Sequence, residues 1–221
     1  MYTNEPAITR SRESVLATNK VIRNTYTLLS MTLIFSALMA AASMSINVGH
    51  GVSLICSLAA IGLIWLVLPR TANSSAGIFV VFGVTGLLGF GLGPILNYYL
   101  AMQGGSEIIG TALGGTGIIF LALSGYALTT RKDFSFLGGF LFVGFFVVLA
   151  AMLVNLFMDI PGLQLAISAA VILIMSGFIL FDTSRIINGG ETNYVLATVG
   201  LYLSIYNIFV HLLAILGSSN D

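Results

Sequence analysis

Residues 161–217 read PGLQLAISAAVILIMSGFILFDTSRIINGGETNYVLATVGLYLSIYNIFVHLLAILG, which is two long apolar runs joined by a short polar connection. Each run is long enough to cross a bilayer as an α-helix, because roughly 30 Å of hydrocarbon takes about 20 helical residues. The runs are continuously apolar rather than alternating, which favours helices over the strands of a barrel. The stretch therefore predicts two transmembrane helices, 161–187 and 193–217.

The rest of the chain has the same character. Of its 221 residues, 57% are hydrophobic and 7% are charged, which is more apolar surface than one soluble core can bury. Five further runs complete a set of seven expected spans, at 25–45, 51–68, 76–100, 106–128 and 134–158. We expect an all-α polytopic membrane protein in contact with the lipid bilayer. Its expected parts are a polar N-terminal arm (1–24), a seven-helix transmembrane domain (25–217) and a short tail (218–221).

The basic residues predict the orientation of these spans. All of them precede the first expected span, follow the second or fourth, or lie at the end of the sixth: Arg10, Arg12, Lys20, Arg23, Arg70, Arg131, Lys132 and Arg185. The connections on the opposite side carry no Lys or Arg. Because short loops rich in Lys and Arg stay in the cytoplasm, we expect the N-terminus inside and the C-terminal tail outside.

Several classes of function are disfavoured by composition. A net charge of zero argues against a nucleic-acid partner, and the single cysteine, Cys56, can form neither a disulfide framework nor a cysteine metal site. A serine protease needs its Ser and His at one depth, but Ser124 and His211 fall near opposite ends of their spans. We expect no catalytic activity and no bound cofactor.

The last span carries a polar stripe. Asn193, Asn207 and His211 recur with Ala197, Gly200 and Ser204 at spacings of three and four, which places small and polar side chains on one helix face. Polar groups facing lipid would lose their hydrogen bonds, so this face is expected to turn inward. Two interpretations stay open: an outward-facing wet vestibule, or separate hydrogen bonds between helices.

The third span is rich in glycine and contains Gly93 followed by Pro94. Small residues allow helix backbones to approach closely, which is the simpler interpretation. The alternative is a helix break at Gly93 and Pro94, because proline removes an intrahelical hydrogen bond and frees a carbonyl to line a cavity.

Asp182 is the acidic residue that falls within an expected span rather than at its edge. A carboxylate in hydrocarbon is costly, by roughly 2.5 to 3.5 kcal/mol at mid-bilayer on insertion scales, so it needs a partner or a function. One interpretation pairs it with Arg185, one helical turn later. The other makes it a proton or cation site, with calcium as a transported ion that Asp182 would help to coordinate.

Four segments carry a resemblance to a known family: RNTYTLLSMTLIFSAL (23–38), GLLGFGLGPILNYYL (86–100), YALTTRKDFSFLGG (126–139) and FDTSRIINGGETNYVLATVGLYLSIYNIF (181–209). They resemble the Bax inhibitor family of seven-helix membrane proteins, and within it the bacterial YccA branch. The resemblance runs from about residue 20 to 217. It implies a multi-pass protein of the bacterial cytoplasmic (inner) membrane.

The resemblance implies two activities that differ in kind. The YccA branch is associated with FtsH, a membrane-anchored ATP-dependent protease, as a slow substrate that also restrains it. Other bacterial relatives are pH-sensitive calcium leak channels, in which aspartates on the sixth and seventh helices and an arginine on the second form the switch. Asp182 matches the sixth-helix acid, but Ser204 stands at the seventh-helix position and the second span has only Arg70, at its end. This departure predicts a weak leak and favours the protease association.

The polar N-terminal arm, 1–24, has too little apolar content to fold alone. It is expected to be either a frayed, solvated tail or a cytoplasmic segment that an ATP-driven protease can grip.

Overall fold

The computed structural model describes residues 5–158, 160 and 162–218, with side chains from Leu16 onward. Within these ranges the chain is helical and contains no strand. Seven helical segments are long and apolar enough to cross a membrane. The predicted all-α class and the seven spans are therefore confirmed. Most of the C-terminal tail, residues 219–221, lies outside the described part of the chain.

The helices follow one another through short connections. In chain order they are α1 (Glu5–Ser45), α2 (His50–Gly62), the π-helix η1 (Leu63–Val67), α3 (Leu68–Thr71), α4 (Ala76–Leu100), α5 (Gly105–Thr130), α6 (Leu137–Met158), α7 (Leu163–Ile187) and α8 (Tyr194–Ser218). Where the chain turns before α5, Gly104 adopts a positive φ of 71°, a conformation that costs glycine little.

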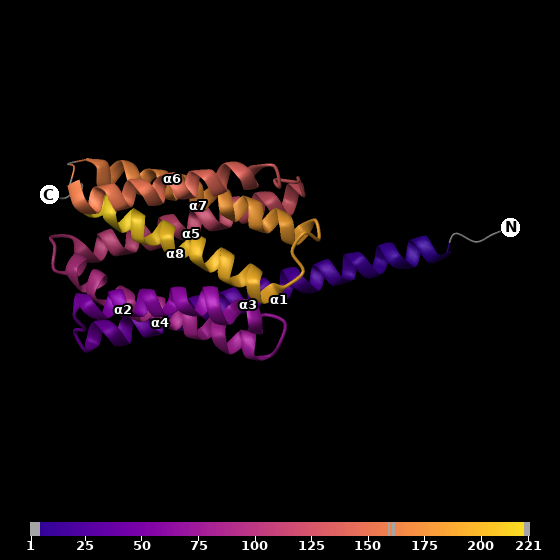
Figure 1. Cartoon of the computed structure of the whole chain (residues 1–221), viewed down its shortest axis with the longest axis horizontal. Helices are drawn as coiled ribbons and strands as arrows, with labels where there is room; N and C mark the ends of the chain where they lie inside the picture. The colour runs from indigo at the N-terminus through magenta and orange to yellow at the C-terminus, as the bar shows by residue number, and fades with distance from the viewer. Residues whose placement is uncertain (1–4, 159, 161, 219–221) are drawn as a thin grey trace.

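The first helix is longer than predicted. Residues 5–24 of the expected polar arm are helical rather than frayed, because they continue the first span as one helix. No Gly or Pro interrupts the sequence from Ala7 to Ser45, and Pro6 falls in the first turn, where its missing N–H is not needed. The candidate membrane span within this helix begins at Leu16. In Figure 1 its N-terminal part projects well beyond the other helices.

The second span is a composite of α2, η1 and α3 and reaches Thr71, three residues past the predicted end. Pro69 cannot donate a hydrogen bond to the preceding turn, and its ring crowds that turn. The widened turn of η1 lies immediately before it. The Arg70 guanidinium donates to the Leu66 carbonyl in this segment.

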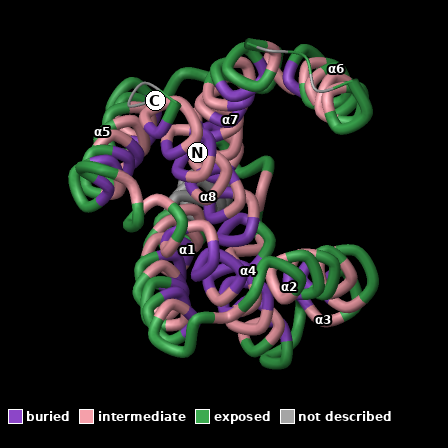
Figure 2. The backbone as a smooth tube through the Cα atoms, turned by 90° about the vertical axis from the view of Figure 1, so that its left-hand side faces the viewer, coloured by how far each residue is buried: buried purple, intermediate pink, exposed green. Residues whose placement is uncertain are grey.

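The spans form two groups joined by α8. Figures 1 and 2 show α1, α2 and α4 on one side of the molecule and α5, α6 and α7 on the other, with α8 between them. α8 packs against α7 and α5 in one group and against α1 and α4 in the other. A helix in this position must be buried on several faces, and half of the residues in the most apolar 18-residue stretch of α8 are buried.

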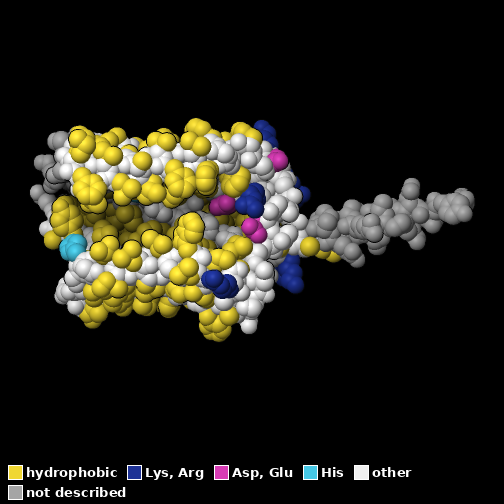
Figure 3. All heavy atoms as spheres, in the orientation of Figure 1, with side chains coloured by type: hydrophobic (Ala, Val, Ile, Leu, Met, Phe, Trp, Pro, Cys, Tyr) yellow, Lys and Arg dark blue, Asp and Glu magenta, His cyan; other side chains and the backbone are white. Residues whose placement is uncertain are grey.

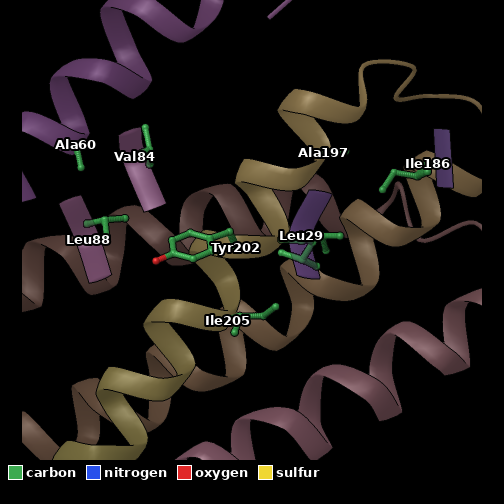
Figure 4. Close-up of a cluster of buried hydrophobic side chains, with 9 residues drawn as sticks. Leu29, Ala60, Val84, Leu88, Ile186, Ala197, Tyr202 and Ile205 are labelled. Carbon is green, nitrogen blue, oxygen red and sulfur yellow. The ribbon is translucent and has the colours of Figure 1, made fainter. Parts of the chain in front are cut away.

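The core follows from this central position. Figure 4 shows Tyr202 and Ile205 of α8 among Leu29, Val84 and Leu88 from α1 and α4. The Tyr202 hydroxyl donates to the Thr85 carbonyl (3.2 Å), and Ser36 Oγ lies 2.6 Å from the same hydroxyl oxygen. A buried hydroxyl between two partners avoids the cost of an unmade hydrogen bond and fixes the depth of α8 against α1 and α4.

The outer surface of the bundle is apolar. Only 6% of the most apolar 18-residue stretch of α6 is buried inside the protein. Phe140, Phe142 and Phe157 of this helix are exposed. In water such a face would be unstable, whereas in a bilayer it contacts acyl chains. The protein is accordingly a multi-pass membrane protein.

Candidate functional site

Asp182 lies at the seam between α7 and α8, where it is partly buried. Its carboxylate contacts Gly200 of α8 so closely that a Cβ placed on Gly200 would be 2.9 Å from Asp182 Oδ2. Among the described residues the carboxylate has no hydrogen-bond donor within bonding distance. The absence of a side chain at position 200 therefore makes room for an acid that its neighbours do not neutralise.

Arg185 does not form the expected pair with Asp182. The ion pair found among the described residues joins Arg185 Nη2 to Glu191 Oε2 at 3.6 Å. The same nitrogen donates to the Gly190 carbonyl (3.1 Å), and the guanidinium carbon lies 5.5 Å from the centre of the Phe181 ring. The turn at Gly189, where φ is 76°, brings Glu191 back to Arg185, and this contact replaces the predicted pair one helical turn apart.

Ser204 is buried on α8, one turn beyond Gly200. Its hydroxyl donates to the Gly200 carbonyl (3.2 Å) rather than to Asp182. Arg70, the basic residue nearest to the expected switch position, is committed to the Leu66 carbonyl. The structure thus brings Asp182, Gly200 and Ser204 to one part of the seam but supplies neither a second acid nor a basic partner from the second span.

The polar stripe of α8 consists of separate hydrogen bonds. Asn193 accepts from the Val195 and Leu196 N–H groups at the start of α8, and its amide donates to Asn73 and to the Ala72 carbonyl. Asn207 donates to the Leu203 carbonyl in its own helix. His211 Nδ1 lies 3.0 Å from Ser168 Oγ on α7, and both side chains are buried. Of the two open interpretations, these contacts favour scattered hydrogen bonds over a wet vestibule.

The predicted helix break at Gly93 and Pro94 is wrong, because α4 continues through both residues to Leu100. Gly93 instead packs directly on Ser43 of α1, whose Oγ is buried without a partner among the described residues. The Gly91 carbonyl, also on α4, accepts a hydrogen bond from Ser53 Oγ (2.7 Å). The glycines of α4 therefore serve close helix contact, the simpler of the two interpretations.

The residues considered for a serine protease lie in separate surroundings. Ser124 is hydrogen-bonded to the Tyr26 hydroxyl on α1, while His211 contacts Ser168, so the two residues are held by different partners. Among the described residues no group of three or more His, Cys, Asp or Glu side chains is placed to hold a metal ion. Calcium coordination at Asp182 would have to recruit hydroxyl and carbonyl oxygens.

Two features of the site were not found from the sequence. Glu191 was not recognised as the partner of Arg185, although the Gly189-Gly190 turn between them is a signal for a reversal of the chain. The second feature is a cavity of about 440 Å³ in the bundle, where Phe120 of α5 and Ala40 of α1 face Tyr206 of α8. No local pattern marks it, because its lining comes from four helices in separate parts of the sequence, α1, α4, α5 and α8.

The chain matches the family described as "Inhibitor of apoptosis-promoting Bax1" over residues 18–221. It is 51% identical over 220 residues to an uncharacterized membrane protein of Vibrio cholerae, covering 99% of both chains. It is 54% identical over 206 residues to a protein of Escherichia coli named modulator of FtsH protease YccA, covering 93% of both. These names are not those of enzymes.

Proposed function

The chain belongs to the Bax inhibitor family, and from this premise we propose that it modulates a membrane-anchored ATP-dependent protease of the FtsH type in the bacterial inner membrane. The observation that carries the proposal is the 54% identity to the named modulator, which extends over 93% of both chains. An alignment of that extent includes all the spans rather than one shared segment. We infer that the protein binds the protease, restrains its action on other membrane proteins and is itself degraded slowly.

The N-terminal helix supports a role as a protease substrate. Residues 5–15 precede the candidate span that begins at Leu16 and are already helical. Eleven helical residues extend about 16 Å at 1.5 Å per residue, which is enough to leave the headgroup region. Figure 1 shows this segment standing clear of the bundle. A helical segment that projects from a bundle is easily unfolded, as an ATP-driven protease requires of the part that it grips.

The charge distribution supports a cytoplasmic position for that segment. Figure 3 shows the visible Lys and Arg side chains at the end of the bundle from which the N-terminal helix projects. Arg70 and Arg185 lie in the last turns of the second and sixth spans, and Lys132 follows the fourth, so all three mark the end to which these spans return the chain. By the positive-inside rule this end faces the cytoplasm, where ATP is available to the protease.

The experiment is a turnover assay in cells that contain the protease and in cells that lack it. Removing residues 2–15 should lengthen the half-life of the protein only where the protease is present, while leaving the bundle inserted. Removing residues 219–221, which follow the last described residue of α8, is the control and should leave the half-life unchanged. Co-purification with the protease would be measured on the same variants. Equal half-lives for the full and trimmed chains would refute the N-terminal segment as the grip, and absence of co-purification would refute the association.

A cation leak is the second candidate function, and one observation favours it. Figure 3 shows a hollow on this face of the molecule, with acidic and basic side chains at its end toward the N-terminal helix. Asp182 is partly buried near that end of α7, beside Gly200, and has no ion-pair partner in the part of the chain that the structure describes. With Ser204 bonded within α8, a single carboxylate would have to attract the ion, so we expect the leak to be small.

The leak would be measured as calcium entry into dye-loaded proteoliposomes between pH 6 and 8. Flux above empty vesicles that disappears in Asp182→Asn would support it. Glu107→Gln, which neutralises an acidic residue in the first turn of α5, is the matched control. Flux that is the same in Asp182→Asn and in the unaltered protein would exclude Asp182 as the ion site.

A further inference from the structure

A crevice of about 310 Å³ opens between α1, α5 and α7 at the basic end of the bundle. Its polar lining comes from Thr18, Asn19, Asn188 and Arg131, and its apolar lining comes from Ile22, Leu128 and Ile187. Neither proposed function uses it. A concave site with a few convergent polar groups over an apolar base is what small amphiphilic ligands require.

The crevice lies at headgroup depth. The candidate spans that border it begin at Leu16 and end at Thr130 and Ile187, so its lining belongs to the terminal turns of three spans. Helix ends at this level leave the hydrocarbon and enter the polar region of the bilayer. The molecules most abundant at that depth are phospholipids, with the phosphate above the acyl chains.

Arg131 supplies a full positive charge to the crevice. Its guanidinium has no hydrogen-bond or ion-pair partner among the described side chains, while Arg185 is paired with Glu191 and Arg70 with a carbonyl. The nearby acid Asp133 is occupied by Ser135. Arg131 also has a positive φ of 51° at the end of α5, a position where glycine is conformationally easier.

Negative partial charge reaches the same crevice from two helix ends. α5 and α7 both end there, and the last carbonyls of a helix carry the negative end of its dipole. Some of these carbonyls are satisfied, since Arg131 N donates to Ala127 and Asn188 N donates to Ser184. No donor among the described residues reaches the carbonyls of Leu128 and Ile187. The crevice therefore presents one cation beside unpaired acceptors, which suits a zwitterion better than a simple anion.

We propose that this crevice binds the headgroup of a phosphoethanolamine phospholipid. The Arg131 guanidinium donates two hydrogen bonds to the phosphate, and the ammonium donates to the open carbonyls of Leu128 and Ile187. Asn19 and Asn188 contact the glycerol oxygens, and the first methylenes lie on Ile22 and Leu128. This proposal does not depend on either function proposed above.

Three lipids with identical acyl chains test it: phosphatidylethanolamine, phosphatidylcholine and phosphatidylglycerol. Each would be titrated onto the delipidated full-length protein in detergent, with native mass spectrometry as the readout. All three carry a phosphate, but phosphatidylcholine has no N–H donor and phosphatidylglycerol has no cation. We expect phosphatidylethanolamine to bind about tenfold more tightly than the other two, the equivalent of one charge-assisted hydrogen bond. Tightest binding by phosphatidylglycerol would overturn the proposal.

Arg131→Gly is the decisive variant, because glycine accepts a positive φ and the turn should be kept. We expect it to lose about tenfold in affinity for phosphatidylethanolamine while its thermal unfolding without lipid is unchanged or slightly raised. Lys132→Gln removes the same charge at the next position, outside the crevice lining, and should bind normally. Equal losses in the two variants would reduce the effect to general surface charge. Equally tight binding of water-soluble glycerophosphoethanolamine would overturn a lipid as the occupant.

Discussion

Gly200 and Asp182 are packed so closely that any side chain at position 200 would meet the carboxylate, since a Cβ there would lie 2.9 Å from Oδ2. The two residues come from α8 and α7, so the seam between these helices closes around an acidic group. Because Arg185 is engaged by Glu191, the Asp182 carboxyl group has no partner within ion-pair distance among the described residues. Burying this unpaired carboxyl group is unfavourable for folding, and groups of this kind are typical of functional sites.

Asp182→Asn is therefore expected to stabilise the protein. Asparagine keeps the shape of the side chain and removes the charge, so the free energy of unfolding should rise by about 1 kcal/mol. Thermal unfolding in detergent at neutral pH would measure it. Glu107→Gln, in the first turn of α5, is the control and should lose a few tenths of a kcal/mol, because a negative charge there is favourable. A lower unfolding temperature for Asp182→Asn would mean that the carboxylate has a stabilising partner.

Gly89→Ala should destabilise the contact between α1 and α4. A Cβ on Gly89 would run into the Ser36 backbone oxygen and lie 2.8 Å from Ser36 Cα, and backbone atoms cannot move aside cheaply. Overpacking of this kind costs about 1 to 3 kcal/mol, more than the roughly 1 kcal/mol that alanine gains over glycine in a helix.

Gly110→Ala is the matched control for Gly89→Ala. Its Cβ would meet nothing within 4 Å on the exposed face of α5, so only the helix-propensity gain remains. Thermal unfolding of the two variants should move in opposite directions. Similar shifts would show that the α1 and α4 backbones are not in close contact in the folded protein.

The spans could be predicted from the sequence because bilayer crossing depends on length and hydropathy, which are local properties. The second span extends three residues beyond its predicted end, because Pro69 was taken as a helix stop. In the structure a π-turn precedes Pro69 and the helix continues to Thr71. The arm before residue 25 was assigned as unstructured on its polarity. Helix continuation depends instead on the absence of breakers, which the sequence from Ala7 to Ser45 also showed.

The candidate site was predicted only in part. Asp182 and the small residue Gly200 followed from hydropathy and helix spacing, each within its own segment. The partner of Arg185 was missed because helical spacing suggested Asp182, while the Gly189 turn returns Glu191. Side-chain partners across helices depend on the rotation of each helix in the bundle. A single sequence does not specify that rotation, so close packing and a helix break both stayed open at Gly93 until its contact with Ser43 was known.

Tyr202→Phe should destabilise the centre of the bundle. The Tyr202 hydroxyl donates to the Thr85 carbonyl, so Ser36 Oγ, at 2.6 Å, must donate to it in turn. Removing the hydroxyl leaves Ser36 and the Thr85 carbonyl buried without this partner, at a cost of about 1 to 3 kcal/mol. Thermal unfolding would be compared with Tyr98→Phe, an exposed tyrosine on α4, which should change little. Equal behaviour of the two variants would show that Tyr202 is not hydrogen-bonded in the folded protein.

The loop after α5 offers a titration that lies outside the membrane spans. Ser135 donates to Asp133 Oδ1 from its hydroxyl (2.5 Å) and its backbone N–H (2.8 Å), and these bonds lower the pKa of Asp133 below its ordinary value. A carboxyl whose pKa is lowered by folding stabilises the fold above its unfolded pKa and loses that contribution as pH falls through the folded value. The contribution of Asp133 is therefore intact at neutral pH and disappears in acid.

Ser135→Ala removes the hydroxyl donor, which is the larger cause of the shift, and keeps the backbone donor. The pKa of Asp133 should rise toward its ordinary value without reaching it. The measurement is a pH titration of the carboxyl carbon resonances in protein labelled at aspartate, with Asp133→Asn used to assign the signal. Ser30→Ala, whose hydroxyl bonds within α1 far from this loop, should leave the titration unchanged. An Asp133 pKa that stays the same in Ser135→Ala would show that the hydroxyl contact is not maintained in solution.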